Sequence, residues 1–240
     1  MRKFLLGLLL LIPVAASAAD EVTVAPRKSA GEIAYYPKLV NFPDPQVRDR
    51  VNKLLAGYGL QQSQDRKDCY KQLQDQGQQK DKDSFYTSIE VTHVSRRFLS
   101  INVNQNTDCG GAHPSSGASP VTLDLTHGTE VDWKTMFKPG FLSATDPKTF
   151  DTRQGKLAAL YRAHYAKIRK GDKDCLDAIH DENFLDVVLW LDKNGLTANP
   201  QLPHVTQACD EDVAFSPAEL APYIADPNLL AELQAMPAKK

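Results

Sequence analysis

Two glycines and a histidine in the segment CGGAHPSSG, residues 109–117, are the residues whose types and spacing best suit recognition or chemistry. Gly110 and Gly111 permit backbone conformations that other residues avoid, and such a backbone exposes its amides beside the imidazole of His113. The competing interpretation is that the glycines only permit a tight crossing between two strands and that His113 holds this crossing by hydrogen bonding. We name Gly110, Gly111, His113 and Pro114 as candidate binding residues.

Metal and nucleophilic chemistry find little support in the spacing of the residues. The side chains that suit zinc are His93, His113, His127 and Asp124. They match no zinc motif, HExxH included. No GxSxG elbow is present, and the serines after His113 lie in a polar loop without a catalytic base. We therefore predict no catalytic residue, no metal site and no cofactor.

Three predicted strands position the glycine loop. Apolar and polar residues alternate over residues 85–93, 99–104 and 121–126, which is the period of a half-buried strand. The segment between the second and third strands is too rich in glycine, proline and serine to predict a regular element. We expect its serines to lie in a flexible polar loop: Ser115, Ser116 and Ser119.

Upstream, a strand is expected over residues 31–40, followed by a helix that Asp44 caps. Pro45 stands at the first helical position, and an apolar stripe runs from Val47 to an end at Gly57. Residues 61–83 are rich in Gln, Lys and Asp. Two interpretations stay open for them: a helix that a disulfide from Cys69 holds down, or a mobile polar loop.

The C-terminal half alternates between helical and strand patterns. Helices are predicted over residues 157–168, 175–184 and 217–224, and strands over 187–192, 196–199, 204–209 and 212–215. Asn194 and Gly195 form the strongest hairpin signal of the chain. We predict an α+β fold, a mainly antiparallel sheet with several helices packed on it, in a single domain stapled by disulfides.

Four cysteines without a CxxC motif favour two disulfides in an exported chain. Three pairings are possible. We favour Cys69 with Cys109 and Cys175 with Cys209, because each pair joins segments that are close in chain order.

The first 18 residues have the pattern of a secretory signal peptide: a basic start, an apolar run and a small-residue cleavage site. The predicted organisation is a signal peptide at 1–18, a flexible lead-in at 19–29, the domain at 30–232 and a tail at 233–240. No second apolar segment and no cysteine near the cleavage site is present, so we expect a periplasmic or extracellular protein without a lipid anchor or membrane span.

Cleavage after residue 18 removes two positive charges and takes the formal net charge from −2 to −4. A mildly acidic protein is a poor partner for nucleic acid and a suitable one for a basic protein.

The glycine loop, with its flanking strands, also resembles a known family. GGAH at 110–113, LDLTHGTE at 123–130 and WKTMFKPG at 133–140 resemble the extracytoplasmic domains of unknown function found in the lysozyme-sensing anti-sigma factor RsiV and beside the catalytic domain of the peptidoglycan deacetylase PdaC. Residues 35–55 and 214–224 resemble the family's first and last segments. The chain differs from the pattern at Cys109 and Pro114, which bracket the motif.

This resemblance implies a non-enzymatic binding protein of the cell envelope that binds or inhibits lysozyme, or that recognises peptidoglycan fragments. The alternative is a peptidoglycan-directed enzyme, or an accessory domain of cell-wall glycan modification. Such an enzyme needs a cleft with convergent polar groups, and the sequence offers no catalytic set for one.

Overall fold

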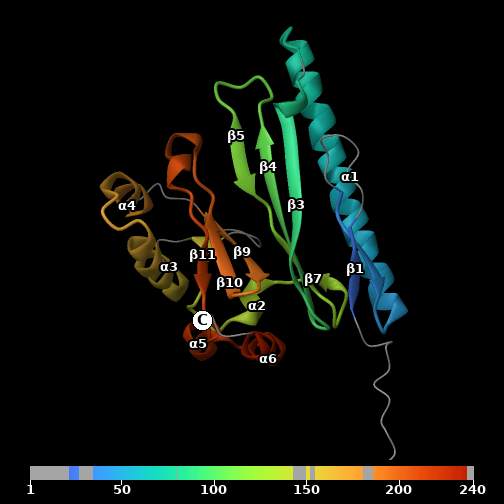
Figure 1. The fold of residues 1–240 in the computed structure, drawn as a ribbon, viewed down its shortest axis with the longest axis vertical. Helices are drawn as coiled ribbons and strands as arrows, with labels where there is room; N and C mark the ends of the chain where they lie inside the picture. The colour runs from blue at the N-terminus through green and yellow to red at the C-terminus, as the bar shows by residue number, and fades with distance from the viewer. Residues whose placement is uncertain are drawn as a thin grey trace, which may run out of the picture.

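The structure is a computed structural model, and it describes residues 22–26, 35–79, 81–142, 150–151, 155–180 and 186–236. Over these residues the chain forms two halves, each with an antiparallel sheet and its own helices (Figure 1). Two disulfides, Cys69–Cys109 and Cys175–Cys209, are present. The predicted α+β class and the favoured disulfide pairing are therefore confirmed.

The sheet of the N-terminal half follows the order β3-β4-β6-β7, and β5 also pairs with β4. Its strands are β3 (Phe85–Val94), β4 (Phe98–Thr107), β5 (Ser115–Ala118), β6 (Val121–Asp124) and β7 (Thr129–Glu130). The three predicted strands are confirmed. The expectation of a flexible loop is wrong for residues 115–118, because they pair with residues 104–107 of β4. The backbone hydrogen bonds of this pairing order the segment, although its composition does not predict a strand.

Helix α1 (Pro45–Asp75) covers one face of this sheet. The Asp44 carboxylate accepts hydrogen bonds from the backbone amides of Gln46 and Val47, as the predicted cap requires. The predicted end at Gly57 is wrong, since the helix continues to Asp75, about five turns further. A helical glycine costs about 1 kcal/mol, and the buried Cys69 and Leu73 further along outweigh that cost. The helical interpretation thus holds for residues 61–75.

A short ribbon, β1 (Thr23–Ala25) paired with β2 (Lys38–Asn41), lies beside α1. The Asn52 side chain fastens it by accepting the Leu39 amide and donating to the Leu39 carbonyl. The prediction of a flexible lead-in is therefore wrong for residues 23–25, where pairing with β2 supplies the order. Of the strand predicted over 31–40, residues 38–40 are in β2, and 31–34 lie outside the described residues.

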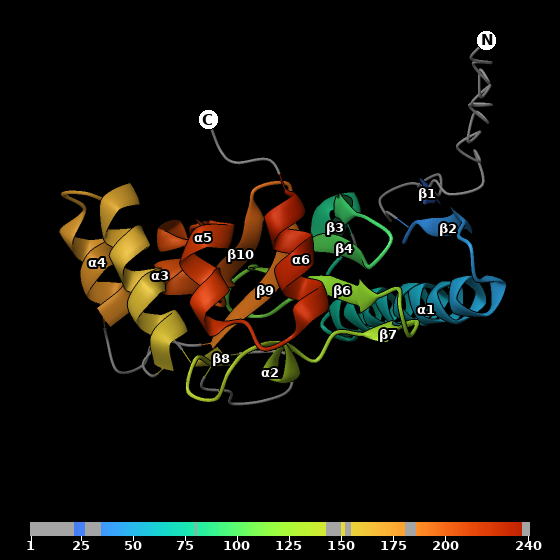
Figure 2. The same cartoon turned by 90° about the horizontal axis from the view of Figure 1, so that it is seen from below.

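The sheet of the C-terminal half follows the order β11-β10-β9-β8. The strands are β8 (Phe150–Asp151), β9 (Asp186–Asp192), β10 (Gly195–Pro200) and β11 (Val213–Phe215). The helices described in this half are α2 (Trp133–Met136), α3 (Gly155–Ile168), α4 (Lys173–His180), α5 (Pro217–Leu220) and α6 (Pro227–Ala235). Figures 1 and 2 place α3 and α4 beside this sheet, and α5 and α6 at its lower end. The 3-10 turns η3 (His204–Cys209) and η4 (Ala221–Tyr223) also belong to this half, whereas η2 (Lys82–Ser84) precedes β3 in the N-terminal half.

Two predictions fail in this half. Residues 204–209 form the 3-10 turn η3 instead of a strand, because amides here bond to carbonyls three residues back, as in Thr206 N to Pro203 O (2.9 Å). The expected tail begins too early, since residues 233–235 belong to α6 and Leu233 is fully buried in the core. The predicted hairpin at Asn194 and Gly195 is confirmed.

Polar side chains join the two halves. The Ser100 hydroxyl of β4 accepts a hydrogen bond from the Leu191 amide of β9 at 3.1 Å. The Thr92 hydroxyl of β3 donates a hydrogen bond to the Leu191 carbonyl at 2.7 Å. Below them, the His93 imidazole lies 2.8 Å from the Glu232 carboxylate of α6. Burial by itself raises the pKa of Glu232. Hydrogen bonds from His93 and Ser95 outweigh this effect, so the pKa of Glu232 lies below its ordinary value. Within the described ranges, no helix is long and apolar enough to cross a membrane.

Candidate functional site

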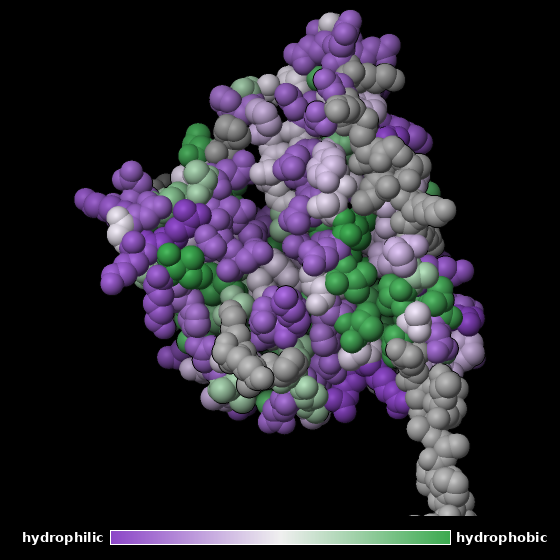
Figure 3. Space-filling view, viewed as in Figure 1, coloured by the Kyte–Doolittle hydropathy of each residue, from purple (hydrophilic) through white to green (hydrophobic). Residues whose placement is uncertain are grey.

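The loop 108–114 connects β4 to β5 at the upper end of the molecule, beside the C-terminal end of α1 (Figure 1). Gly111, His113 and Pro114 are exposed, and Gly110 is half-buried. Figure 3 shows that mostly hydrophilic residues cover this end. The four sequence-predicted residues therefore lie together on one protruding loop, and none of them lines the cavity described below.

The loop is braced at its base. Cys109 is bonded to Cys69 of α1, whose side chain is buried, with 4.9 Å between the two Cα atoms. The Asp108 amide donates to the Ser84 carbonyl at 2.8 Å, and directly after the loop Ser115 pairs with Thr107 of β4. These contacts fix both ends of the loop, so its tip is exposed without being free to adopt any conformation.

The two glycines of the loop differ in role. Gly110 has a φ of +80°, and a Cβ atom there would collide with the Gln76 side chain, so any other residue is strained at this position. Gly111 does not have a positive φ, and the nearest atom to an added Cβ is the His113 carbonyl oxygen at 3.8 Å. The geometric role that the competing interpretation gives to the glycines therefore applies to Gly110, whereas Gly111 and His113 are exposed.

The histidines that suit zinc are not brought together. His93 contacts Glu232, His127 lies 2.6 Å from Asp124 in the β6–β7 turn, and His113 is at the loop tip. In the part of the chain that the structure describes, no three His, Cys, Asp or Glu side chains are arranged to hold a metal ion.

A cavity of about 590 Å³ lies where the cores of the two halves adjoin. Tyr36 and Tyr58 line its N-terminal side, Trp133 lines its C-terminal side, and Glu130 of β7 also contributes. The Tyr58 hydroxyl donates to the Glu130 carboxylate at 2.7 Å, and the two tyrosine rings have centroids 5.5 Å apart. The cavity therefore combines three aromatic side chains with one carboxylate.

Both tyrosine hydroxyls in this cavity are hard to ionise. Burial, followed by the negative charges of Glu130 and Asp65, raises the pKa of Tyr36 to about 12. Burial and the hydrogen bond to Glu130 raise the pKa of Tyr58 as well.

Sequence reasoning missed this cavity because its lining comes from separate segments. Tyr36 precedes β2, Tyr58 is in α1, Glu130 is in β7 and Trp133 is in α2. No spacing of residues links them. The nearest signal in the sequence was the apolar run Trp133, Met136 and Phe137, which the structure buries in the C-terminal core.

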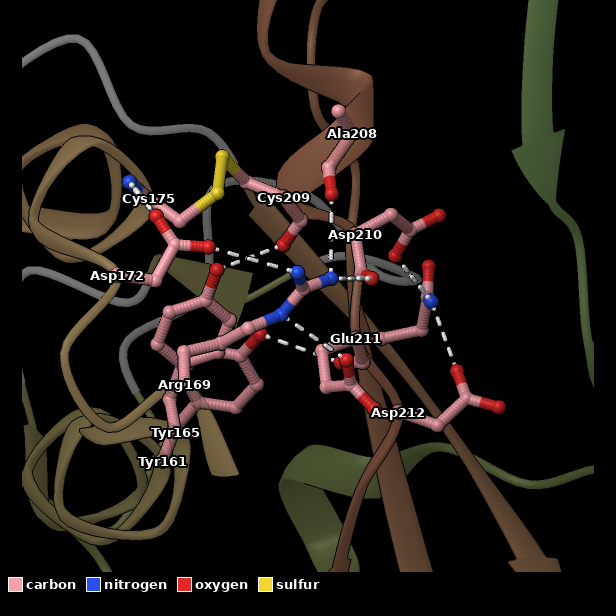
Figure 4. A network of polar contacts seen from close by, with 11 residues as sticks. Tyr161, Tyr165, Arg169, Asp172, Cys175, Ala208, Cys209, Asp210, Glu211 and Asp212 are labelled. Carbon is pink, nitrogen blue, oxygen red and sulfur yellow. Dashed lines mark hydrogen bonds and ion pairs between the residues drawn. A yellow bond between two sulfur atoms is a disulfide. The ribbon is translucent and has the colours of Figure 1, made fainter. Parts of the chain in front are cut away.

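The second disulfide lies in a network of internal contacts (Figure 4). The Tyr165 hydroxyl donates to the Cys209 carbonyl at 2.8 Å, and the Arg169 guanidinium donates to the carbonyls of Ala208 and Asp210, each at 3.1 Å. The same guanidinium lies 3.1 Å from the Glu211 carboxylate. These groups bind one another, so the network holds η3 against α3 and α4.

Two carboxylates at the edge of this network share one amide. Asn199 donates to Asp210 at 2.7 Å and to Asp212 at 2.8 Å. Burial raises the pKa of both carboxyls, and the hydrogen bonds from Asn199 only partly oppose it. Both amide hydrogens are used inside the protein, which is the arrangement of a structural contact.

No family model matches this chain, and no curated protein matches it either. Two solved structures are similar to it. A member of the DUF3298 family from Bacteroides fragilis NCTC 9343 has a TM-score of 0.52 and 13% identity, over 90% of this chain and 97% of that chain. A DUF3298 family protein from Pseudomonas aeruginosa PAO1 has a TM-score of 0.53 and 16% identity, over 88% of this chain and 97% of that chain. The chain therefore shares the fold of DUF3298 family proteins.

Proposed function

We propose that this chain is an exported, non-enzymatic binding protein of the cell envelope that docks with a lysozyme-like protein through residues 108–114. The observation that carries the proposal is a loop that is exposed at its tip and covalently braced at its base by Cys69–Cys109. Bracing lowers the entropy cost of binding, because less freedom remains to be lost when a partner engages the loop. A protruding, pre-ordered loop suits a partner with a concave site.

The disulfides and the leader pattern of residues 1–18 support the proposed periplasmic or extracellular location. Disulfides persist in the periplasm or outside the cell, where the environment is oxidising. All four cysteines of the chain are paired, and the first 18 residues have the pattern of a signal peptide. A periplasmic or extracellular location would bring the protein into contact with lysozyme and with peptidoglycan.

Two arguments support lysozyme as the partner. The GGAH loop with its flanking strands resembles a family that includes a lysozyme-sensing protein. The formal net charge of −4 after leader removal would steer the chain toward a basic lysozyme. Because steering acts through long-range charge, added salt should slow association and weaken binding.

The alternative, a peptidoglycan-directed enzyme or accessory domain, has weaker support. Glycoside hydrolysis commonly uses two carboxylates that face each other across the bond to be cut. Glu130 is the one acidic side chain among the described residues that line the cavity between the halves. A binding role at the exposed loop therefore accounts for more of the geometry.

Calorimetric titration with a c-type lysozyme at low and high salt tests the proposal. We expect saturable binding that weakens with salt, and a loss of at least about tenfold in affinity for His113→Ala. His127→Ala is the matched control, since His127 is an exposed histidine in the distant β6–β7 turn and should leave affinity unchanged.

A cell-wall clearing assay run beside the titration separates the two functions. Slower clearing by lysozyme in the presence of this protein would support inhibition. Absence of binding at about 50 μM protein would exclude lysozyme as the partner. Turnover of peptidoglycan by the protein alone, lost in a folded His113→Ala variant, would support the enzyme instead.

A further inference from the structure

We propose that the cavity between the two halves binds a small organic cation with an apolar body, such as a quaternary or protonated amine. The site would be formed by Tyr36, Tyr58, Glu130 and Trp133. It is separate from the loop 108–114, so the proposal goes beyond lysozyme docking and does not depend on it.

The position and size of the cavity suit a small ligand. Ligand sites occur preferentially where two packed units meet, and their volumes are commonly about 300 to 1,000 Å³. This cavity has a volume of about 590 Å³, and its remaining wall is largely apolar, with Val131, Val188 and Leu189 among the lining residues. These side chains would bury the apolar body of the ligand.

The charge of the cavity selects a cation. Glu130 is the one charged side chain among its described lining residues. The faces of aromatic rings carry negative potential and attract ammonium groups, tryptophan most strongly. Three aromatic side chains and a carboxylate therefore contribute potential of the same sign.

The hydrogen bonds of the cavity favour a cation over a sugar. Recognition of a sugar requires many donors and acceptors directed at its hydroxyls. Here the Tyr58 hydroxyl donates to Glu130 at 2.7 Å, the Thr122 hydroxyl is 2.9 Å from that of Ser100, and Gln201 donates to Asn199 at 3.4 Å. A quaternary ammonium group forms no conventional hydrogen bond and needs none of these groups.

Two cations lie on the other side of Glu130. Arg50 and Lys53 line a neighbouring hollow together with Tyr58 and Glu130. Arg50 donates through Nε to the His127 carbonyl at 3.2 Å, and it is not among the residues that line the cavity. Lys53 would reduce the negative potential that a ligand experiences, so its removal should strengthen binding.

The test uses two probes that differ in charge alone. Choline and 3,3-dimethylbutan-1-ol have nearly the same shape, but the second has carbon in place of the quaternary nitrogen. We expect choline to bind the full-length, oxidised protein at least about tenfold more tightly, and benzyltrimethylammonium to bind more tightly still because of its larger apolar body. Titration calorimetry measures all three affinities.

Glu130→Gln keeps an oxygen that accepts from Tyr58 and removes the charge, so choline affinity should fall at least about tenfold. Lys53→Gln should raise it by about two- to threefold. Glu90→Gln, at an exposed carboxylate on β3, is the control and should leave choline affinity unchanged.

Three results would overturn the proposal: equal affinity for the two isosteric probes, unchanged choline affinity in a folded Glu130→Gln variant, or no saturation by about 20 mM choline. If Glu130→Gln fails to fold, the isosteric pair on the wild-type protein decides.

Discussion

Cys69–Cys109 and Cys175–Cys209 span 40 and 34 residues, so chain entropy predicts about 4 kcal/mol of stabilisation for each. Their surroundings differ. Cys175–Cys209 is part of the large C-terminal core and of the Arg169 and Tyr165 network. Cys69–Cys109 joins an exposed loop to the end of a long helix. The same covalent bond therefore reinforces a packed core in one region and holds a surface loop in the other.

The N-terminal region depends more on its disulfide because less else holds it. The lower half of α1 buries Val47, Val51 and Leu55 against the sheet, whereas beyond Gly59 the buried residues are Gln62, Cys69 and Leu73. Neither polar atom of the Gln62 side chain has a hydrogen-bond partner, and such a buried amide costs stability. A loop placed over this weakly packed end can be exposed for binding only if a covalent bond fixes its base.

Alanine substitutions at three glycines compare the rigidity of the two regions. At Gly195, φ is +138° and an added Cβ would collide with the Phe215 carbonyl oxygen, so we expect a loss of about 3 kcal/mol in the free energy of unfolding. At Gly110 the obstacle is the Gln76 side chain, which can turn away, so about 1 to 2 kcal/mol is expected. Gly111→Ala, at an open position, should stay within about 0.5 kcal/mol of the wild type.

Urea unfolding monitored by circular dichroism measures the three differences. A Gly110→Ala variant as unstable as Gly195→Ala would show that the loop region is as rigid as the core, and would remove the contrast between the two disulfides.

Tyr165→Phe tests the contact between α3 and η3. The substitution removes the hydrogen bond of the Tyr165 hydroxyl to the Cys209 carbonyl, and we expect a loss of about 1 kcal/mol in the free energy of unfolding. Tyr86→Phe, at an exposed tyrosine of β3, serves as the control and should have no measurable effect. Thermal unfolding of both variants provides the comparison. Equal melting temperatures for Tyr165→Phe and the wild type would mean that the disulfide and the Arg169 contacts hold η3 without this hydrogen bond.

Asp212→Asn produces the smallest effect, and it appears as a change in pH dependence. Burial raises the pKa of Asp212 above its ordinary value of 3.8, so the folded protein takes up this proton more readily than the unfolded chain. The contribution to stability is fully present below pH 3.8 and is lost as the pH rises through the raised pKa. Removing this carboxyl should therefore stabilise the protein at pH 7 relative to the wild type, and less so near pH 4.

Denaturant midpoints of wild type and variant at each pH measure this difference. The wild-type midpoint must be subtracted from that of the variant at each pH, because other groups also make stability depend on pH. Glu219 and Glu232 have lowered pKa values, so their contribution to the stability of the protein is lost as the pH falls. Asp177→Asn, at an exposed position of α4, should run parallel to the wild type. Parallel curves for Asp212→Asn as well would contradict a raised pKa at Asp212.

The strands and caps were predictable where the cause is local. Alternation over residues 85–93, the Asp44 cap and the turn at Asn194 and Gly195 are decided by residues near one another in the sequence. The disulfide pairing was predictable because both bonds join segments close in chain order. The four loop residues were found together because they are contiguous.

Several of the errors occur where contacts between residues far apart in the sequence determine the structure. Residues 115–118 have the composition of a loop and become a strand through pairing with β4. Gly57 resembles a helix end, yet α1 passes through it because residues further along are fastened to the sheet and the loop. The cavity at Glu130 needs four segments to be folded together before it exists. No single-sequence pattern contains that information.

The central claim is that Cys69–Cys109 holds the loop locally, whereas Cys175–Cys209 stabilises the core as a whole. Amide hydrogen exchange followed by mass spectrometry tests it on two double variants, Cys69→Ala with Cys109→Ala and Cys175→Ala with Cys209→Ala. Exchange reports local opening and global unfolding separately, since each segment has its own protection.

For the first variant, we predict faster exchange concentrated in residues 61–79 and 108–114, with the C-terminal core protected as in the wild type. For the second, we predict faster exchange across α3, α4 and the strands β9 to β11, with residues 108–114 changed no more than the rest. Wild-type protection of residues 108–114 in the first variant, or the same pattern of exchange in both, would contradict the account.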